Sequence, residues 1–287
     1  MTVLAALFAS LAWGVADFLG GAQSRRLAAV SVAAGSQVVG LLLLGTLAII
    51  TRPTIPQAAT LLAGVAAGVS SFVGLTLMYR ALATGTMGVV APIVGSSAVV
   101  PLLWGVVQGD RLTAWQTAGT GACLIGILIV TRGSREPEKA AIAGAPQSHA
   151  RANLRPIALA AASAIIFGAS LAFLAEGADE APLVTTVVMR IAAATVAVVV
   201  VAASRQLRPV DRRSIVPILA IGTLDAGAYL AFGWASSTAQ LAIVSVLSAL
   251  YPVVTAVLAF LFHAERLTRV QLGGVALTLA GVAAIAL

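Results

Sequence analysis

Cysteine and histidine are scarce in this 287-residue chain, and each scarcity removes a class of function. The single cysteine, Cys123, lies inside an apolar stretch, so the sequence has neither a disulfide framework nor a cysteine metal site. The two histidines, His149 and His263, have no paired acidic motif near them, so the usual patterns of metal enzymes are missing. We therefore expect no metal, no cofactor and no enzymatic activity.

Charge is also scarce. Only 9% of the residues are charged, against roughly 25% in an ordinary soluble domain. Hydrophobic residues make up 60% of the chain, and its mean hydropathy is +1.04. A water-soluble fold of this size cannot hide so much apolar surface, whereas a lipid bilayer accommodates it. The composition thus excludes a soluble domain and extended disorder, and it favours a protein embedded in lipid.

Ten apolar stretches fill almost the whole chain, most of them near the roughly 20 residues that a helix needs to cross the hydrocarbon core. They predict an all-α membrane protein with ten transmembrane helices, at about 3–22, 30–50, 58–80, 86–107, 114–131, 154–175, 182–203, 214–234, 240–262 and 268–286. The first stretch has no basic residues before it and nine more stretches follow, so we interpret it as a mature helix and not as a signal peptide.

The stretches form two sets of five, and the second set repeats the first. The matching pieces, at offsets of 154 and 155, are Trp13-Gly14 with Phe167-Gly168, and Asp110-Arg111-Leu112-Thr113 with Glu265-Arg266-Leu267-Thr268. We therefore expect two five-helix repeats, 1–131 and 154–287, joined by a cytoplasmic linker at 132–153. Because five is an odd number, the second repeat must be inverted relative to the first, which is an architecture of secondary transporters.

Basic residues fall in alternate gaps between the stretches. Fourteen lie in the odd-numbered gaps, only Arg52 and Arg111 lie in the even ones, and Arg190 lies inside a stretch. Since Lys and Arg concentrate in cytoplasmic loops, the odd gaps are predicted to be cytoplasmic and both termini to lie outside. This sorting accounts for the net charge of +7 without a basic face, so no nucleic-acid partner is expected.

Several pieces of the sequence are similar to a known family. They are Trp13-Gly14 continuing as Asp17-Phe18-Leu19-Gly20-Gly21, the stretch Val188-Met189-Arg190-Ile191-Ala192, and Glu265-Arg266-Leu267-Thr268 before a glycine-rich last helix. With the ten stretches, they make the chain resemble the EamA-type transporters of the drug/metabolite transporter superfamily. The resemblance implies a ten-helix basket with a central cavity, and transport, often export, of amino acids or other small metabolites.

The chain departs from this family in two respects. The better-known relatives have both termini in the cytoplasm, whereas the charge distribution predicts them outside. Gln37 stands roughly where an arginine of the family often opens the second stretch, and Arg190 keeps that position in the second half.

Charged residues inside the stretches are the sharpest functional signal, since each costs roughly 3 kcal/mol or more at the centre of a bilayer. Asp225 and Arg190 lie near mid-depth, and we expect them to approach each other or to share a wet cavity. Either Asp225 binds a proton or a polar substrate group, or the two residues form a permanent ion pair. Asp17 either exchanges protons in the cavity or pairs with Arg25 or Arg26.

Aromatic and hydroxyl residues complete the candidate site. Tyr229 follows Asp225 by one helical turn. Prolines interrupt the fourth stretch (Pro92 and Pro101) and the ninth (Pro252), which hold equivalent places in the two halves, and this points to binding at the midplane unless the prolines only shape packing. The other candidates for substrate binding or coupling are Trp13, Ser96, Ser97, Trp234, Ser245, Ser248 and Tyr251.

These patterns predict a secondary transporter of the plasma membrane that exports a small polar or amphipathic, amino-acid-like metabolite by alternating access, driven by a proton or substrate gradient. A polytopic membrane enzyme acting on a lipid-type substrate is the alternative, and an ion channel or scaffold is a third hypothesis. Small residues on the last helix of each half predict close helix packing, within a protomer or in a homodimer. They are Gly119, Ala122, Gly126, Gly274 and Gly281.

Overall fold

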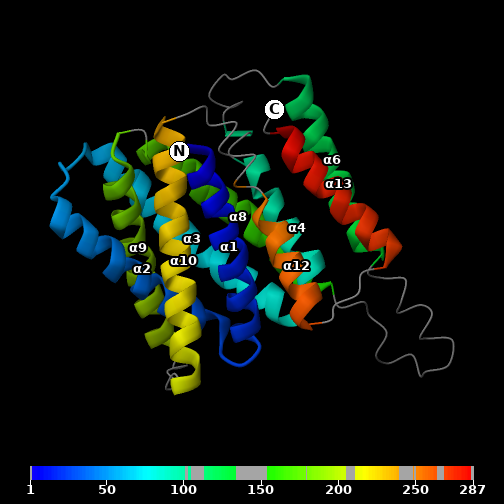
Figure 1. Ribbon diagram of the computed structural model, residues 1–287, viewed down its shortest axis with the longest axis horizontal. Coiled ribbons are helices and arrows are strands. Elements are labelled where there is room, and N and C mark those ends of the chain that lie inside the picture. The colour runs from blue at the N-terminus through cyan, green and yellow to red at the C-terminus, as the bar shows by residue number, and fades with distance from the viewer. Residues whose placement is uncertain are drawn as a thin grey trace.

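The computed structural model describes residues 2–100, 103–104, 113–133, 154–178, 180–204, 211–238, 248, 250–263 and 268–285. In these ranges the chain forms ten α-helices and one 3-10 helix, without strands (Figure 1). They are α1 (Thr2–Ser24), α2 (Ala29–Thr51), α3 (Ala58–Thr84), α4 (Met87–Gly95), η1 (Ser96–Ala98), α6 (Ala114–Gly133), α8 (Arg155–Ala178), α9 (Pro182–Ser204), α10 (Arg212–Thr238), α12 (Tyr251–His263) and α13 (Arg269–Ile285). A helix pairs its backbone groups internally, which the bilayer core demands.

The predicted all-helical class is confirmed, and each of the ten predicted stretches contains one of these helices. Six helices are long and apolar enough to cross a membrane, namely α1, α2, α3, α8, α9 and α10. The helices α12 and α13 are apolar but shorter. The described part of the chain therefore has the helices of a multi-pass membrane protein, and the count of ten crossings stays a prediction.

Two predicted stretches are described only in part. The fourth contains α4 and η1, and the ninth contains α12, which begins at Tyr251. Pro92 lies inside α4, as predicted, whereas Pro252 lies in the first turn of α12, where a missing N–H costs no helical hydrogen bond. The chain before Pro252 and most of the predicted 132–153 linker lie outside the described residues.

The helices at the two ends of the molecule are paired. In Figure 1, α2 and α9 lie together at one end and α6 and α13 at the other, with α1, α3, α8 and α10 nearer the centre. A Cβ on Gly281 of α13 would lie 2.6 Å from Gly119 O, and a Cβ on Gly126 of α6 would lie 2.7 Å from Gly274 O. The C-terminal part of each helix therefore contacts the N-terminal part of the other, so α6 and α13 are antiparallel. Their small residues pack within the chain.

Both helices of this last pair begin with the same hydrogen-bonded cap. Thr113 N donates to Gln116 Oε1 at 2.9 Å, and Gln116 N donates to Thr113 Oγ1 at 3.2 Å. Thr268 and Gln271 make the same two bonds at 3.0 and 3.2 Å. In such a capping box the two side chains satisfy N–H groups that the first turn leaves unpaired. The sequence match between these two helix starts therefore has a local structural cause.

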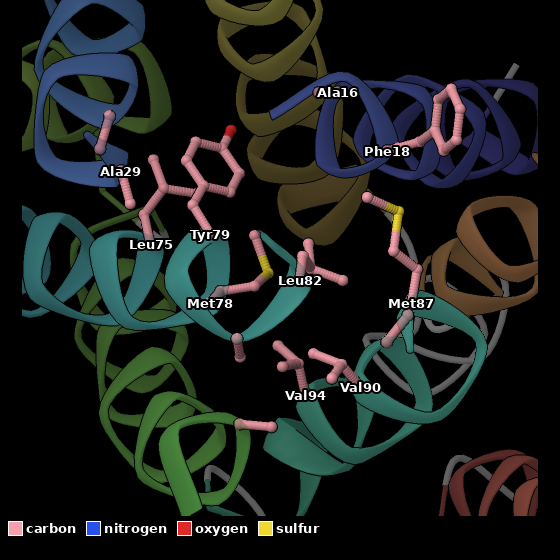
Figure 2. Packing of buried hydrophobic residues seen from close by; sticks show 14 of the residues in the cluster. Ala16, Phe18, Ala29, Leu75, Met78, Tyr79, Leu82, Met87, Val90 and Val94 are labelled. Carbon is pink, nitrogen blue, oxygen red and sulfur yellow. The ribbon is translucent and has the colours of Figure 1, made fainter. Parts of the chain in front are cut away.

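Apolar side chains fill the contact between α3 and α4. Figure 2 shows Met78 and Leu82 of α3 beside Val90 and Val94 of α4, and none of the four is more than 2% exposed. The hydrophobic effect contributes little between helices surrounded by lipid, so close packing of such side chains is a main source of stability there.

Candidate functional site

Arg190 of α9 lies at the centre of a buried polar cluster, and its side chain is 0% exposed. Its Nη1 atom donates to Asp225 Oδ2 of α10 at 2.7 Å and to Gln37 Oε1 of α2 at 2.6 Å. The first contact is a charge-assisted hydrogen bond, the stronger kind in proteins. The predicted approach of Arg190 and Asp225 is confirmed, and one nitrogen joins three helices.

Four aromatic side chains form a connected group that begins at this cluster. The Arg190 guanidinium carbon lies 4.7 Å from the centre of the Tyr229 ring, in cation–π geometry. Trp13 of α1 packs edge-on against Tyr229, with ring centres 5.1 Å apart. Its ring centre also lies 5.7 Å from that of Phe232 and 6.2 Å from that of Tyr251. The predicted candidates Trp13, Tyr229 and Tyr251 therefore come together.

Asp17 is the second buried carboxylate of this region. It lies on α1, is 6% exposed, and is close enough to Asp225 for their charges to interact. Among the described residues we find no ion pair or hydrogen bond to its carboxylate, so the predicted pairing with Arg25 or Arg26 is not formed there. Three tyrosine hydroxyls are close enough to Asp17 to interact with its charge, those of Tyr79, Tyr229 and Tyr251.

Hydrogen-bond donors without an acceptor gather here. Within the described residues, the buried side-chain atoms of this cluster that lack a partner are Arg190 Nε and Nη2, Gln37 Nε2, Trp13 Nε1 and Tyr251 Oη. The predicted candidate Ser248 is also buried, and its Oγ lacks a partner. A buried donor left unpaired costs about 1–3 kcal/mol, and more when it is charged. Because native proteins pair nearly all such groups, a cluster of exceptions needs an explanation. A ligand that supplies acceptors would provide one.

The helices that carry the predicted prolines meet next to Tyr251. A Cβ on Gly95 of α4 would lie 2.5 Å from Cγ of Pro252, so glycine is what permits the contact. Ser96, the first residue of η1, donates its hydroxyl to Ile93 O of α4 at 2.6 Å, and Ser97 is buried close to Tyr251. Of the two predicted serines on this segment, Ser97 is thus the one beside the aromatic group.

One predicted candidate is not part of this cluster, and another lies outside the described residues. Trp234 is 45% exposed on the outside of α10. It follows Asp225 by nine residues, or about two and a half helical turns, which places it on the opposite face. Ser245 lies outside the described residues. In the part of the chain that the structure describes, no group of three or more His, Cys, Asp or Glu could hold a metal ion.

Sequence reasoning missed two members of the site and misjudged a third. Ser71 Oγ lies 3.4 Å from Tyr229 Oη, and the Tyr79 ring rests against Gly20, where any Cβ would overlap it. Gln37 stood out only as a departure from a family pattern, although its pairing with position 190 could have suggested contact. A lone serine in an apolar helix gives no such signal, because most serve the backbone of their own helix.

Comparison with known proteins places this geometry in a family. The model of the EamA-like transporter family matches residues 1–132 and 154–287. One solved crystal structure is similar in fold, with a TM-score of 0.64, 17% sequence identity, and coverage of 99% of this chain and 95% of that one. No curated protein matches the sequence. Since the family model covers nearly the whole chain, the protein belongs to the EamA-like transporter family, within the drug/metabolite transporter superfamily.

Proposed function

We propose that this protein is a secondary transporter that moves a small polar or amphipathic metabolite across the plasma membrane by alternating access between two inverted five-helix halves. The Arg190 cluster is its substrate and coupling site. The observation that carries the proposal is the Arg190–Gln37 hydrogen bond, because it joins α2 of the first half to α9 of the second at roughly corresponding positions, 153 residues apart. The buried charge therefore lies where the halves meet.

A second contact of the same kind supports a twofold relation between the halves. Cys123 Sγ donates to Thr278 O at 3.5 Å, and these residues are 155 positions apart. Around a twofold axis, residues on the axis contact their own equivalents. A line through the Gln37–Arg190 and Cys123–Thr278 contacts is therefore a candidate for the axis that relates the two halves.

Contacts away from that line are reciprocal. A Cβ on Gly14 would meet Tyr251 O and Val254, and a Cβ on Gly168 would meet Ser97 O and Val100. Each of these three residues in the first half precedes its counterpart by 154 positions. A twofold interface requires this pattern, in which residue i of one half contacts j of the other and j contacts i.

The direction of the last helices favours inversion. The helices α6 and α13 hold equivalent places in the two halves and run antiparallel. A twofold axis along the membrane normal would leave equivalent helices parallel, whereas an axis in the membrane plane reverses them. This supports the inverted arrangement over a simple duplication.

Alternating access follows from placing a charge at such an axis. Arg190 is held by Gln37 of the first half and Asp225 of the second, so rocking one half against the other must change at least one bond. A proton or a substrate group at Asp225 or Asp17 would shift the equilibrium between the two arrangements of the halves, because a ligand favours the state that it binds more tightly.

Reconstituted vesicles test the proposal. Vesicles that contain the purified chain, loaded with unlabelled metabolites, should accumulate labelled metabolite transiently and saturably by counterflow. We expect Asp225→Asn to insert normally and to lose proton-linked uptake, with the exposed Arg80→Gln as the matched control. Single-channel conductance, chemical conversion of the solute, or an Asp225→Asn variant with wild-type uptake and pH profile would contradict the proposal.

A further inference from the structure

The Arg190 guanidinium has an unused edge. Arginine carries five N–H donors, and Nη1 makes both hydrogen bonds described above, to Asp225 and Gln37. Nε and Nη2 are buried and have no partner among the described residues. The N–H groups of Nε and Nη2 lie side by side in one plane, and they match the two oxygens of a carboxylate. The edge left over is therefore one that binds carboxylates in two-point contacts.

Other buried polar atoms of the same cluster lack a partner as well. Gln37 Nε2 belongs to the residue that Arg190 already contacts, and Trp13 Nε1 and Tyr251 Oη belong to the aromatic group beside Tyr229. A cationic substrate would leave the two N–H donors, Gln37 Nε2 and Trp13 Nε1, unpaired, whereas an acceptor would satisfy several of these groups at once. We infer that the substrate is an organic acid whose carboxylate binds the Nε–Nη2 edge of Arg190, an inference that rests on the proposed transport function.

The surroundings narrow the class of acid. The Tyr229 ring lies against the guanidinium and Trp13 packs on Tyr229, so aromatic surface lies beside Arg190, which suits an apolar or aromatic body. Asp225 pairs with Arg190, and Asp17 is close enough to Asp225 for their charges to interact, so a group with a single negative charge is favoured over a phosphate ester with two. Asp225 already neutralises the positive charge of Arg190. A carboxylate that enters together with one proton therefore leaves the net charge of the site unchanged.

A matched set of ligands tests this inference on the purified full chain in detergent. The set is phenylacetate, its amide phenylacetamide, and phenethylamine, which share one aromatic body. Thermal unfolding should shift upward, saturably, with phenylacetate and not with the other two, because a ligand that binds only the folded state stabilises it. Stabilisation by the amine or amide equal to that by the acid would overturn the inference. So would the absence of any shift with a series of monocarboxylates from acetate to phenylacetate.

A glycine beside the edge offers a variant that keeps every charge. A Cβ on Gly40 of α2 would lie 3.3 Å from Arg190 Nε, so Gly40→Ala places a methyl group against the free edge. Gly45→Ala on the same helix is the control, because its Cβ would meet only Leu41 Cδ1, at 4.0 Å. We expect Gly40→Ala and Arg190→Lys to weaken phenylacetate binding by about tenfold or more, since either change spoils the two-point contact. Binding as tight as in the Gly45→Ala variant would contradict the inference.

Binding and transport separate this inference from the function on which it rests. Phenylacetate that stabilises the protein but shows no counterflow would support the carboxylate site and count against the transporter. Saturable counterflow of an amine, with no stabilisation by any acid, would support the transporter and overturn the carboxylate site.

Discussion

Removal of the Asp225 carboxylate should destabilise the protein more than almost any other single substitution. In Asp225→Ala the fully buried guanidinium of Arg190 keeps only the Gln37 oxygen as a described acceptor. Breaking a buried ion pair from one side costs about 3–5 kcal/mol, because the charge that remains is uncompensated. With roughly 2–4 °C of melting temperature per kcal/mol for a chain of this size, the midpoint should fall by about 6–20 °C.

The assay is loss of helical circular dichroism on heating the purified protein in detergent. The double variant Arg190→Met with Asp225→Leu removes both charges and should recover most of the loss, since well-packed apolar residues often replace a buried pair at no net cost. Arg80→Ala is the exposed control and should leave the midpoint unchanged. A loss below about 1 kcal/mol in Asp225→Ala, or a double variant less stable than the single one, would refute the reasoning.

Three further substitutions probe packing, capping and the site boundary. Gly281→Ala should lower the free energy of unfolding by about 1–3 kcal/mol, because its Cβ would lie 2.6 Å from Cys123 N. Gly273→Ala is the control, since a Cβ there meets open space, and equal melting temperatures of the two variants would contradict the prediction. Thr268→Ala should lower stability by about 1 kcal/mol through loss of its cap, measured by the same melting assay. Trp234→Leu should leave counterflow at the wild-type rate, since its side chain faces away from Arg190. A large loss of counterflow would show that Trp234 belongs to the site.

Much of the fold and part of the site could be predicted from the sequence, for identifiable reasons. A charge inside an apolar stretch is so costly that Asp225 and Arg190 had to be paired or functional, and the structure pairs them at 2.7 Å. The recurrence of Thr113 and Gln116 as Thr268 and Gln271 marked helix starts, because a capping box needs those residue types at that spacing.

Other features could not be predicted, because they depend on how the helices turn toward one another. Apolar residues cover every face of these helices, so hydrophobic periodicity does not reveal which face is inward. The position of Asp17 beside Asp225, and not beside Arg25, is set by the packing of α1 on α10. Helical geometry alone, however, would have shown that Trp234 lies on the face opposite Asp225.

Labelling of two equivalent helix starts tests the inverted arrangement most directly. Ala58 begins α3 and Arg212 begins α10; both are exposed and lie 154 positions apart. In a Cys123→Ser background, Ala58→Cys should react with a membrane-impermeant maleimide in intact cells, and Arg212→Cys only after permeabilisation, because basic gaps are cytoplasmic. Reaction of both cysteines from the same side of the membrane would contradict the inverted halves, and with them the proposed mechanism.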